Sequence, residues 1–288
     1  MKHTANLVMF CVGLILLPAC QSISITEKHF LYPDDSITQE AIDTWERQQT
    51  LEFIKLKATD GTELSGALIT QPNARFTLIY FGGNQFRLES QGGELAKILS
   101  QFENNLLIMD HRGYGMSMGL PSISALQTDA VDIYDYVDSQ PNLAELPIIV
   151  HGLSLGSVIA GSLAKQRPVS GLVLEGSTTT AKEMIDARVP WYAAPFIDLT
   201  ISEELASVDN LANIEHYTGE LLIMVGENDK TTPVSLSESL YQHAVTNTKQ
   251  LFVVEGKGHG NAIKSESFST KYQTFVKGVL LAAESEVL

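Results

Sequence analysis

The stretch VHGLSLGSVIAG, residues Val150–Gly161, places Ser154 between two leucines, with a glycine two positions to either side. Apolar residues ahead of the serine favour a short buried strand, and Val158–Ala164 behind it favour a helix. Glycines at such a bend let strand and helix approach closely, and the serine hydroxyl then lies exposed at the edge of a sheet. The pattern predicts a strand, a tight turn and a helix, in which Ser154 is either a nucleophile or a plain turn residue.

Short apolar runs that end in glycine or polar residues recur along the chain and predict buried strands. They are FTLIYFGGN (76–84), NLLIMDHRGYG (105–115), PIIVHG (147–152), GLVLEGS (171–177), ELLIMVGEND (220–229) and KQLFVVEGKGHG (249–260). Helices are predicted between them, at 92–102, 124–138 and 235–244, and the turn Asp60-Gly61 predicts a β-hairpin from 53–57 and 64–70. Apolar strands that alternate with helices predict an α/β fold whose mostly parallel sheet is covered on both faces.

Polar side chains directly follow several of these predicted strands. They are Asn84, Asp110, Ser154, Asp229 and His259. The carboxyl ends of parallel strands meet at one edge of the sheet, and ligands bind at this edge in open α/β folds. We therefore expect the functional residues to gather there.

A catalytic serine needs a base that removes its proton, and the base must be oriented by an acid. Three histidines follow Ser154 in the chain. His216 falls in a connecting segment and His243 in a predicted helix, which favours surface positions for both. His259 alone follows a predicted strand, in the glycine-rich loop GKGHGN, and is therefore the predicted base.

The orienting acid is predicted in the segment MVGENDKTTP, which follows the preceding strand. Asp229 lies in the loop at the end of this strand and is followed by a turn that Pro233 closes. Glu227 is the competing carboxylate, two residues closer to the strand. The sequence favours Asp229 because this residue lies further into the loop.

Together these segments resemble the α/β-hydrolase superfamily over about residues 53–281. The resemblance rests on Gly152-Leu-Ser-Leu-Gly156, on Gly226-Glu-Asn-Asp229 with Pro233, and on Gly258-His-Gly260, in the family's order. The segment DHRGYGMS (110–117) is similar to the D-x-R-G-x-G-x-S signature of the branch that contains acyl-protein thioesterases, lipid hydrolases and serine-aminopeptidase-like enzymes. The chain departs from the family at Gly82, where many relatives have histidine, and at Leu153, where arginine or histidine is frequent.

The resemblance implies an α/β-hydrolase fold and a serine hydrolase that cleaves an ester or thioester through an acyl-enzyme. It implies the triad Ser154, His259 and Asp229, with the oxyanion bound by the backbone N–H groups of Leu155 and Asn84, or of Gln85 in place of Asn84. Two alternatives remain open. One is a serine-aminopeptidase-like peptidase, and the other is a catalytically silent scaffold or binding lipoprotein on the same fold.

Residues 178–217 leave the alternation of strands and helices, and in hydrolases such an insertion is the cap. The segment MIDARVPWYAAPFIDL (184–199) is rich in aromatic residues, of which Trp191, Tyr192 and Phe196 are candidate pocket residues. They would either bind the acyl chain of a small-molecule or lipid-like substrate or simply pack a small helical cap on the core. The sequence leaves both readings open.

The N-terminus has the layout of a secretory signal, with Lys2 ahead of an apolar run, Leu7–Leu17, of 11 residues. This run is shorter than the roughly 20 residues that span a bilayer. Leu17-Pro-Ala-Cys20 resembles a bacterial lipobox, which implies lipidation of Cys20, whereas the alternative is an ordinary signal peptide with an incidental cysteine. We expect a signal peptide over 1–19, a tether with a short helix over 20–49 and a hydrolase domain over 50–288.

The lipobox reading implies an exported protein whose N-terminal lipid anchors it in a bacterial membrane. Gln21, in place of aspartate, resembles the sorting pattern for the periplasmic face of the outer membrane. The formal charge of −15 argues against a nucleic-acid partner, because phosphate backbones repel an acidic surface. It also implies that attachment comes from lipid chains rather than from basic patches.

No metal or other cofactor is predicted, because zinc, calcium and P-loop motifs are absent from the sequence. The segment GYGMSM invites a dinucleotide-binding reading, but its sixth position is Met118 where glycine or alanine is required. We expect this loop to be structural, with Arg112 hydrogen-bonded to neighbouring loop carbonyls.

Overall fold

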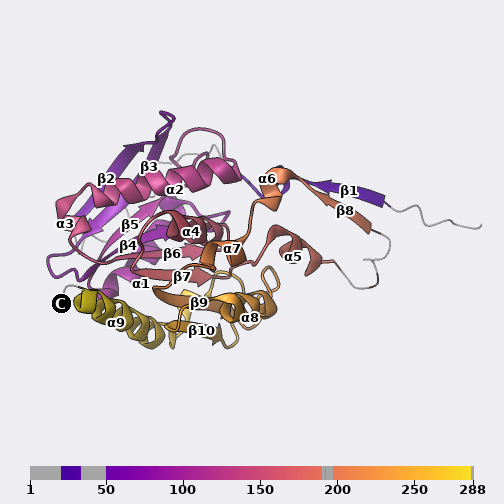
Figure 1. The fold of residues 1–288 in the computed structure, drawn as a ribbon. Helices are drawn as coiled ribbons and strands as arrows, with labels where there is room; N and C mark the ends of the chain where they lie inside the picture. Colours follow the sequence, from indigo (N-terminus) through magenta and orange to yellow (C-terminus); the bar gives the residue numbers. More distant parts are fainter. Residues whose placement is uncertain (1–20, 34–49, 190–191, 193–196, 287–288) are drawn as a thin grey trace, which may run out of the picture.

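A sheet of eight strands forms the centre of the computed structural model, which describes residues 21–33, 50–189, 192 and 197–286 (Figure 1). Its strands are β2 (Thr50–Lys57), β3 (Glu63–Thr70), β4 (Phe76–Phe81), β5 (Asn104–Met109), β6 (Ile148–Leu153), β7 (Gly171–Glu175), β9 (Glu220–Gly226) and β10 (Lys249–Val254). The order across the sheet is β10-β9-β7-β6-β4-β5-β3-β2. Each strand predicted from an apolar run is present.

Most strands of the sheet are parallel and covered by helices on both faces, which explains why they are continuous apolar runs in the sequence. The strands from β10 to β5 are parallel, and every residue of β4, β5 and β9 is buried, since helices cover both faces. Strands β2 and β3 form the predicted antiparallel hairpin at the edge. The carboxyl ends of the parallel strands therefore meet at one edge of the sheet, as expected.

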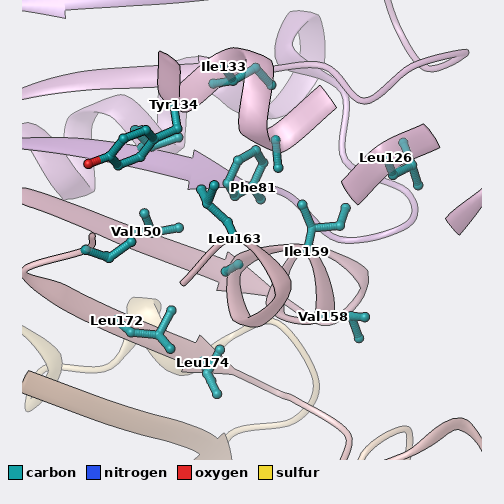
Figure 2. Packing of buried hydrophobic residues seen from close by; sticks show 14 of the residues in the cluster. Phe81, Leu126, Ile133, Tyr134, Val150, Val158, Ile159, Leu163, Leu172 and Leu174 are labelled. Atoms are coloured by element: carbon teal, nitrogen blue, oxygen red, sulfur yellow. The ribbon is translucent and has the colours of Figure 1, made fainter. Parts of the chain in front are cut away.

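Helices lie on the two faces of the sheet in separate hydrophobic clusters. The helices are α1 (Leu88–Leu99), α2 (Ile123–Asp138), α3 (Pro141–Ala144), α4 (Leu155–Gln166), α5 (Ala181–Asp186), α6 (Glu203–Ala206), α7 (Asn210–Ile214), α8 (Val234–His243) and α9 (Phe268–Glu286). Helices α1 and α9 share one cluster with the sheet, and α2, α4 and α8 share the other. Figure 2 shows the second cluster, where Phe81 and Val150 from strands meet Ile133 and Ile159 from helices.

The predicted cap falls in the insertion between β7 and β9. It contains α5, α6 and α7, and also the strand β8 (Ile197–Ile201), where the sequence predicts helices alone. Strand β8 pairs in parallel with β1 (Gln21–Ile25), so that Ile25 lies opposite Ile201. The two strands extend beyond α6, away from the central sheet (Figure 1). The cap is therefore built from both the insertion and the N-terminal segment.

Several predictions fall wholly or partly outside the described residues. They concern the signal sequence with Cys20, the tether helix at 38–47, Trp191 and Phe196. The lipid anchor and its membrane location thus stay predictions. None of the described helices is both long and apolar enough to cross a bilayer.

Candidate active site

Ser154 lies at the bend between β6 and α4, where the sequence predicts it. Its backbone has φ 54° and ψ −112°, a left-handed conformation that a side chain other than glycine rarely adopts. The bend is fixed from both sides, because Ser154 N–H donates to the carbonyl of Glu175 (2.9 Å) and Ser157 N–H donates to the carbonyl of Ser154 (3.0 Å). This strained turn is the geometry that presents a serine hydroxyl at a sheet edge.

The two glycines of the turn are required by close packing. A Cβ at Gly156 would overlap the carbonyl oxygen of Phe81, at the end of β4, and a Cβ at Gly152 would overlap the carbonyl of Gly156. The first turn of α4 therefore rests directly on the ends of β4 and β6. Its N-terminal N–H groups point at the region in front of Ser154, where the helix dipole favours negative charge.

Asp229 and His259 form a hydrogen-bonded pair in the loops that follow β9 and β10. His259 Nδ1 lies 2.7 Å from Asp229 Oδ2. A carboxylate only accepts, so Nδ1 carries the hydrogen and Nε2 is left as the acceptor. The Asp229 side chain is only 1% exposed and that of His259 is 27% exposed. The pair is thus a buried carboxylate beside a partly exposed imidazole.

The remaining bonds of Asp229 fix its carboxylate. Its Oδ1 accepts from the backbone N–H groups of Thr231 and Thr232 (2.8 Å each), and its Oδ2 also accepts from the Thr232 hydroxyl (3.0 Å). Burial by itself raises the pKa of Asp229, but the hydrogen bonds from His259 and from the two backbone N–H groups outweigh it, so the pKa is lowered. The acid is therefore ionised at neutral pH.

Two contacts bring the His259 loop to the serine turn. A Cβ at Gly260 would lie 3.4 Å from Leu153 Cδ2, so the residues that flank His259 and Ser154 are neighbours in space. A Cβ at Gly176 would lie 3.2 Å from His259 Nδ1, and Gly176 follows the residue whose carbonyl holds Ser154. The structure therefore gathers the three predicted residues at the same edge of the sheet.

The competing residues lie elsewhere. Glu227 is exposed, and its carboxylate accepts from the backbone N–H of Gly256 (3.0 Å). His216 and His243 are also exposed, in the connecting segment and at the end of α8, as the sequence predicts. Of the two candidate acids, Asp229 is the one that is hydrogen-bonded to the predicted base.

The loop after β4 contains the predicted second oxyanion donor and faces the serine turn. A Cβ at Gly83 would lie 3.6 Å from Leu153 Cγ. The carbonyl of Gly83 accepts from Phe86 N–H (2.9 Å), which closes a turn around Asn84 and Gln85. Across from this turn, Leu155 is the first residue of α4, so its N–H has no acceptor within the helix. The loop after β4 thus lies next to the serine turn that begins α4.

The segment after β5 supports this loop, a role that sequence reasoning missed. His111 is buried, and its Nε2 donates to the carbonyl of Gly82 (2.7 Å). Asp110 accepts from the N–H of Leu88 (2.7 Å) and so caps α1, which follows the loop. Burial raises the pKa of Asp110 to about 6 and lowers that of His111 to about 4. The sequence marked these residues by their position directly after a strand and by the motif DHRGYGMS, but neither signal predicted these contacts.

The lowered pKa of His111 predicts a pH-dependent stability. The folded protein holds this imidazole neutral, whereas the unfolded chain protonates it near pH 6.5, so the contribution of His111 to the free energy of unfolding falls as pH drops from about 6.5 to about 4. The shift corresponds to about 3 kcal/mol. In H111Q the glutamine amide is expected to donate to the Gly82 carbonyl in place of the imidazole. Because glutamine does not titrate, this contribution to the pH dependence of stability should be lost. Urea unfolding of both proteins between pH 4 and pH 7 checks the prediction, and parallel stability curves would contradict it.

Arg112 does not hydrogen-bond loop carbonyls as expected. Its guanidinium pairs instead with the carboxylates of Asp129 and Asp60 and with the hydroxyl of Thr62. A buried guanidinium needs charged partners more than neutral ones, because they offset its lost hydration. The side chain ties the loop after β5 to helix α2 and to the β2–β3 hairpin, so its role is structural.

Of the candidate pocket residues only Tyr192 is described, and 64% of it is exposed. The described residues contain no group of His, Cys, Asp and Glu side chains that would bind a metal ion.

The chain is similar to proteins of known family. Residues 90–208 match a family model described as serine aminopeptidase, S33. The chain is 30% identical over 187 residues to protein bem46 of Schizosaccharomyces pombe, covering 63% of this chain and 62% of that protein. It is 26% identical over 244 residues to the lysophosphatidylserine lipase ABHD12 of Bos taurus, covering 79% of this chain and 58% of that protein. The chain thus spans about three fifths of the length of these relatives.

The fold is shared with solved structures at low sequence identity. The Pyrococcus furiosus esterase Pf2001 matches with a TM-score of 0.69 at 15% identity, covering 86% of this chain and 98% of that one. This similarity confirms the predicted α/β-hydrolase fold and adds nothing about substrate. The strand order and the serine turn agree with it, so the chain has the α/β-hydrolase fold, and its residues 90–208 are similar to the serine aminopeptidase S33 family.

Proposed function

We propose that this protein is a serine hydrolase that cleaves a carboxylic ester or thioester with Ser154, His259 and Asp229 as its triad. The observation that carries the proposal is the buried Asp229–His259 bond of 2.7 Å, in a loop that contacts the strained turn of Ser154. A turn serine without a catalytic role needs neither the strain nor the oriented imidazole.

Hydrolysis proceeds in two halves. In the first, His259 Nε2 takes the proton of Ser154 Oγ, and Oγ forms a bond to the substrate carbonyl carbon. The tetrahedral intermediate then loses its alcohol or thiol, which leaves with the proton from His259. In the second half, water gives a proton to the same Nε2 and attacks the acyl-enzyme. The acid is released, and Ser154 regains its proton.

The negative charge on the tetrahedral oxygen is bound by backbone N–H groups of Leu155 and Asn84, with Gln85 as the alternative in the same turn. These groups belong to the start of α4 and to the loop after β4, which face one another. One such donor contributes about 3 kcal/mol to the transition state.

The ester class is supported by the name of one sequence relative, the lysophosphatidylserine lipase ABHD12. A lipid-like acyl substrate is therefore preferred. The S33 match favours a second candidate, an aminopeptidase-like activity. Both reactions use the same triad, and they differ in the leaving group that His259 protonates, an alcohol or thiol in one and an amine in the other.

A substrate panel separates these candidates. We expect turnover of p-nitrophenyl acyl esters and none of aminoacyl-p-nitroanilides. Cleavage of the anilides alone would replace the ester assignment by peptide hydrolysis. If the wild-type protein turns over neither class and does not react with a fluorophosphonate, the fold serves as a scaffold and the proposal is wrong.

A further inference from the structure

The residues that follow β1 are packed onto the hydrolase domain rather than extended as a tether. We call residues Glu27–Tyr32 the N-terminal strap. Leu31 is 6% exposed and belongs to the hydrophobic cluster shared by α2 and α4. The carboxylate of Glu27 accepts from the N–H of Ile123, at the start of α2 (3.0 Å). The strap is thus anchored at both ends.

Between these anchors the strap binds the side chain of Asn84. Asn84 Nδ2 donates to the carbonyl of Phe30, and Asn84 Oδ1 accepts from the backbone N–H of Tyr32 (3.2 Å). The same Oδ1 accepts from the hydroxyl of Tyr114 (2.7 Å), and that hydroxyl in turn accepts from Tyr32 N–H (3.0 Å). The Asn84 amide therefore has partners for both its oxygen and its nitrogen.

Tyr114 and Arg87 extend this set of contacts. The Tyr114 side chain is fully buried, and the guanidinium of Arg87 lies over its ring, 4.6 Å from the centroid. Arg87 also donates to the carbonyl of Tyr32 (3.0 Å). The strap, the loop after β4 and the loop after β5 are thus joined at one place.

These contacts matter for catalysis because Asn84 lies in the proposed oxyanion loop. Its backbone N–H is the proposed oxyanion donor, and the two residues before it are glycines without side chains to hold the loop. Fixing the Asn84 side chain therefore fixes the peptide that carries the donor. A displacement of about 1 Å in such a group costs on the order of 10²-fold in rate.

We infer that the N-terminal strap and Tyr114 position the oxyanion loop through the side chain of Asn84. The segment ahead of the hydrolase domain then helps to hold the oxyanion loop in its catalytic position. Tyr114 and the side-chain amide of Asn84 are positioning residues. This inference rests on the proposed function. It goes beyond that function because it assigns a role in catalysis to residues outside the α/β core.

The test measures kcat and KM of Y114F and L31A on an acyl ester, per active site titrated with a fluorophosphonate. Y114F removes the hydroxyl on Asn84 Oδ1, and L31A loosens the strap without touching the loop. The matched control is Y134F, which removes a buried hydroxyl bonded to the carbonyl of Pro168 (2.6 Å). Counting only titrated sites removes losses that come from unfolding.

We expect kcat to fall about 10-fold to 100-fold in Y114F and L31A with KM within about 2-fold, because an oxyanion donor acts in the transition state. Y134F should match the wild type. If kcat of both variants equals that of Y134F, the strap is only structural and the inference is wrong. If the wild type itself does not react with the fluorophosphonate, the proposed function has failed and the inference fails with it.

Discussion

Replacement of Ser154 by alanine is expected to abolish ester hydrolysis, lowering kcat by a factor on the order of 10⁴ to 10⁶. Without the hydroxyl no acyl-enzyme forms, and only water bound near His259 remains to attack the carbonyl. Fluorophosphonate labelling should be lost at the same time, because this reagent reacts with the activated serine. Steady-state kinetics and labelling of the purified protein measure both effects.

The matched control is S162A on the same helix. Ser162 lies on α4, and its hydroxyl accepts from Gln166 within that helix (3.3 Å). S162A should keep both the activity and the label. Hydrolysis by S154A at the wild-type rate would show that the strained turn is not the nucleophile, and the triad proposal would fall.

The central sheet was predictable because the apolar residues that bury each of its inner strands are contiguous in the sequence. A strand that is buried on both faces is apolar over most of its length, so β4 to β7 and β9 are visible as short apolar runs. The turn at Ser154 was predictable for a similar reason, because only glycine fits where Gly156 meets the carbonyl of Phe81. The residues at the ends of strands then follow from the geometry of a parallel sheet.

What the sequence did not predict depends on partners far apart in the chain. Strand β8 forms only because β1, from the N-terminal segment, pairs with it. Helix α1 begins at Leu88 rather than at the predicted Gly92, since the carboxylate of Asp110 caps its first turn. Periodicity and propensity do not encode such contacts, because neither partner carries a local signal.

The same limit applies to the site. His259 and Asp229 each carried a signal, a polar residue in a loop after an apolar strand. The role of the N-terminal strap had none, because the strap acts through the backbone of Tyr32 and Phe30. Any residue at those two positions offers a carbonyl or an N–H, so their side-chain identities do not predict the contact.

Asp229→Asn is expected to lower kcat about 10⁴-fold while the fold is kept. The asparagine Oδ1 still accepts from the N–H groups of Thr231 and Thr232. The new amide, however, donates to His259 Nδ1 where the carboxylate accepted. The imidazole then carries its hydrogen on Nε2, which no longer takes the proton of Ser154. The fall in kcat therefore comes from the changed tautomer of His259 and not from a change in the fold.

The lowered pKa of Asp229 adds a second expectation for the same variant. The ionised carboxylate stabilises the folded protein above its unfolded pKa of about 4, and this contribution is lost as pH falls through the lowered pKa. D229N lacks the contribution at every pH. The difference in free energy of unfolding between wild type and D229N should therefore shrink in acid, which urea titrations measure.

The matched variant is E227Q, which removes the competing carboxylate two residues away. Because Glu227 bonds the N–H of Gly256 at the surface, E227Q should keep kcat within about 2-fold. Each variant lacks one of the two carboxylates of the same loop. Comparing their kcat values therefore shows which carboxylate orients His259. If E227Q loses activity and D229N keeps it, the loop rearranges in the working enzyme and Glu227, rather than Asp229, orients His259.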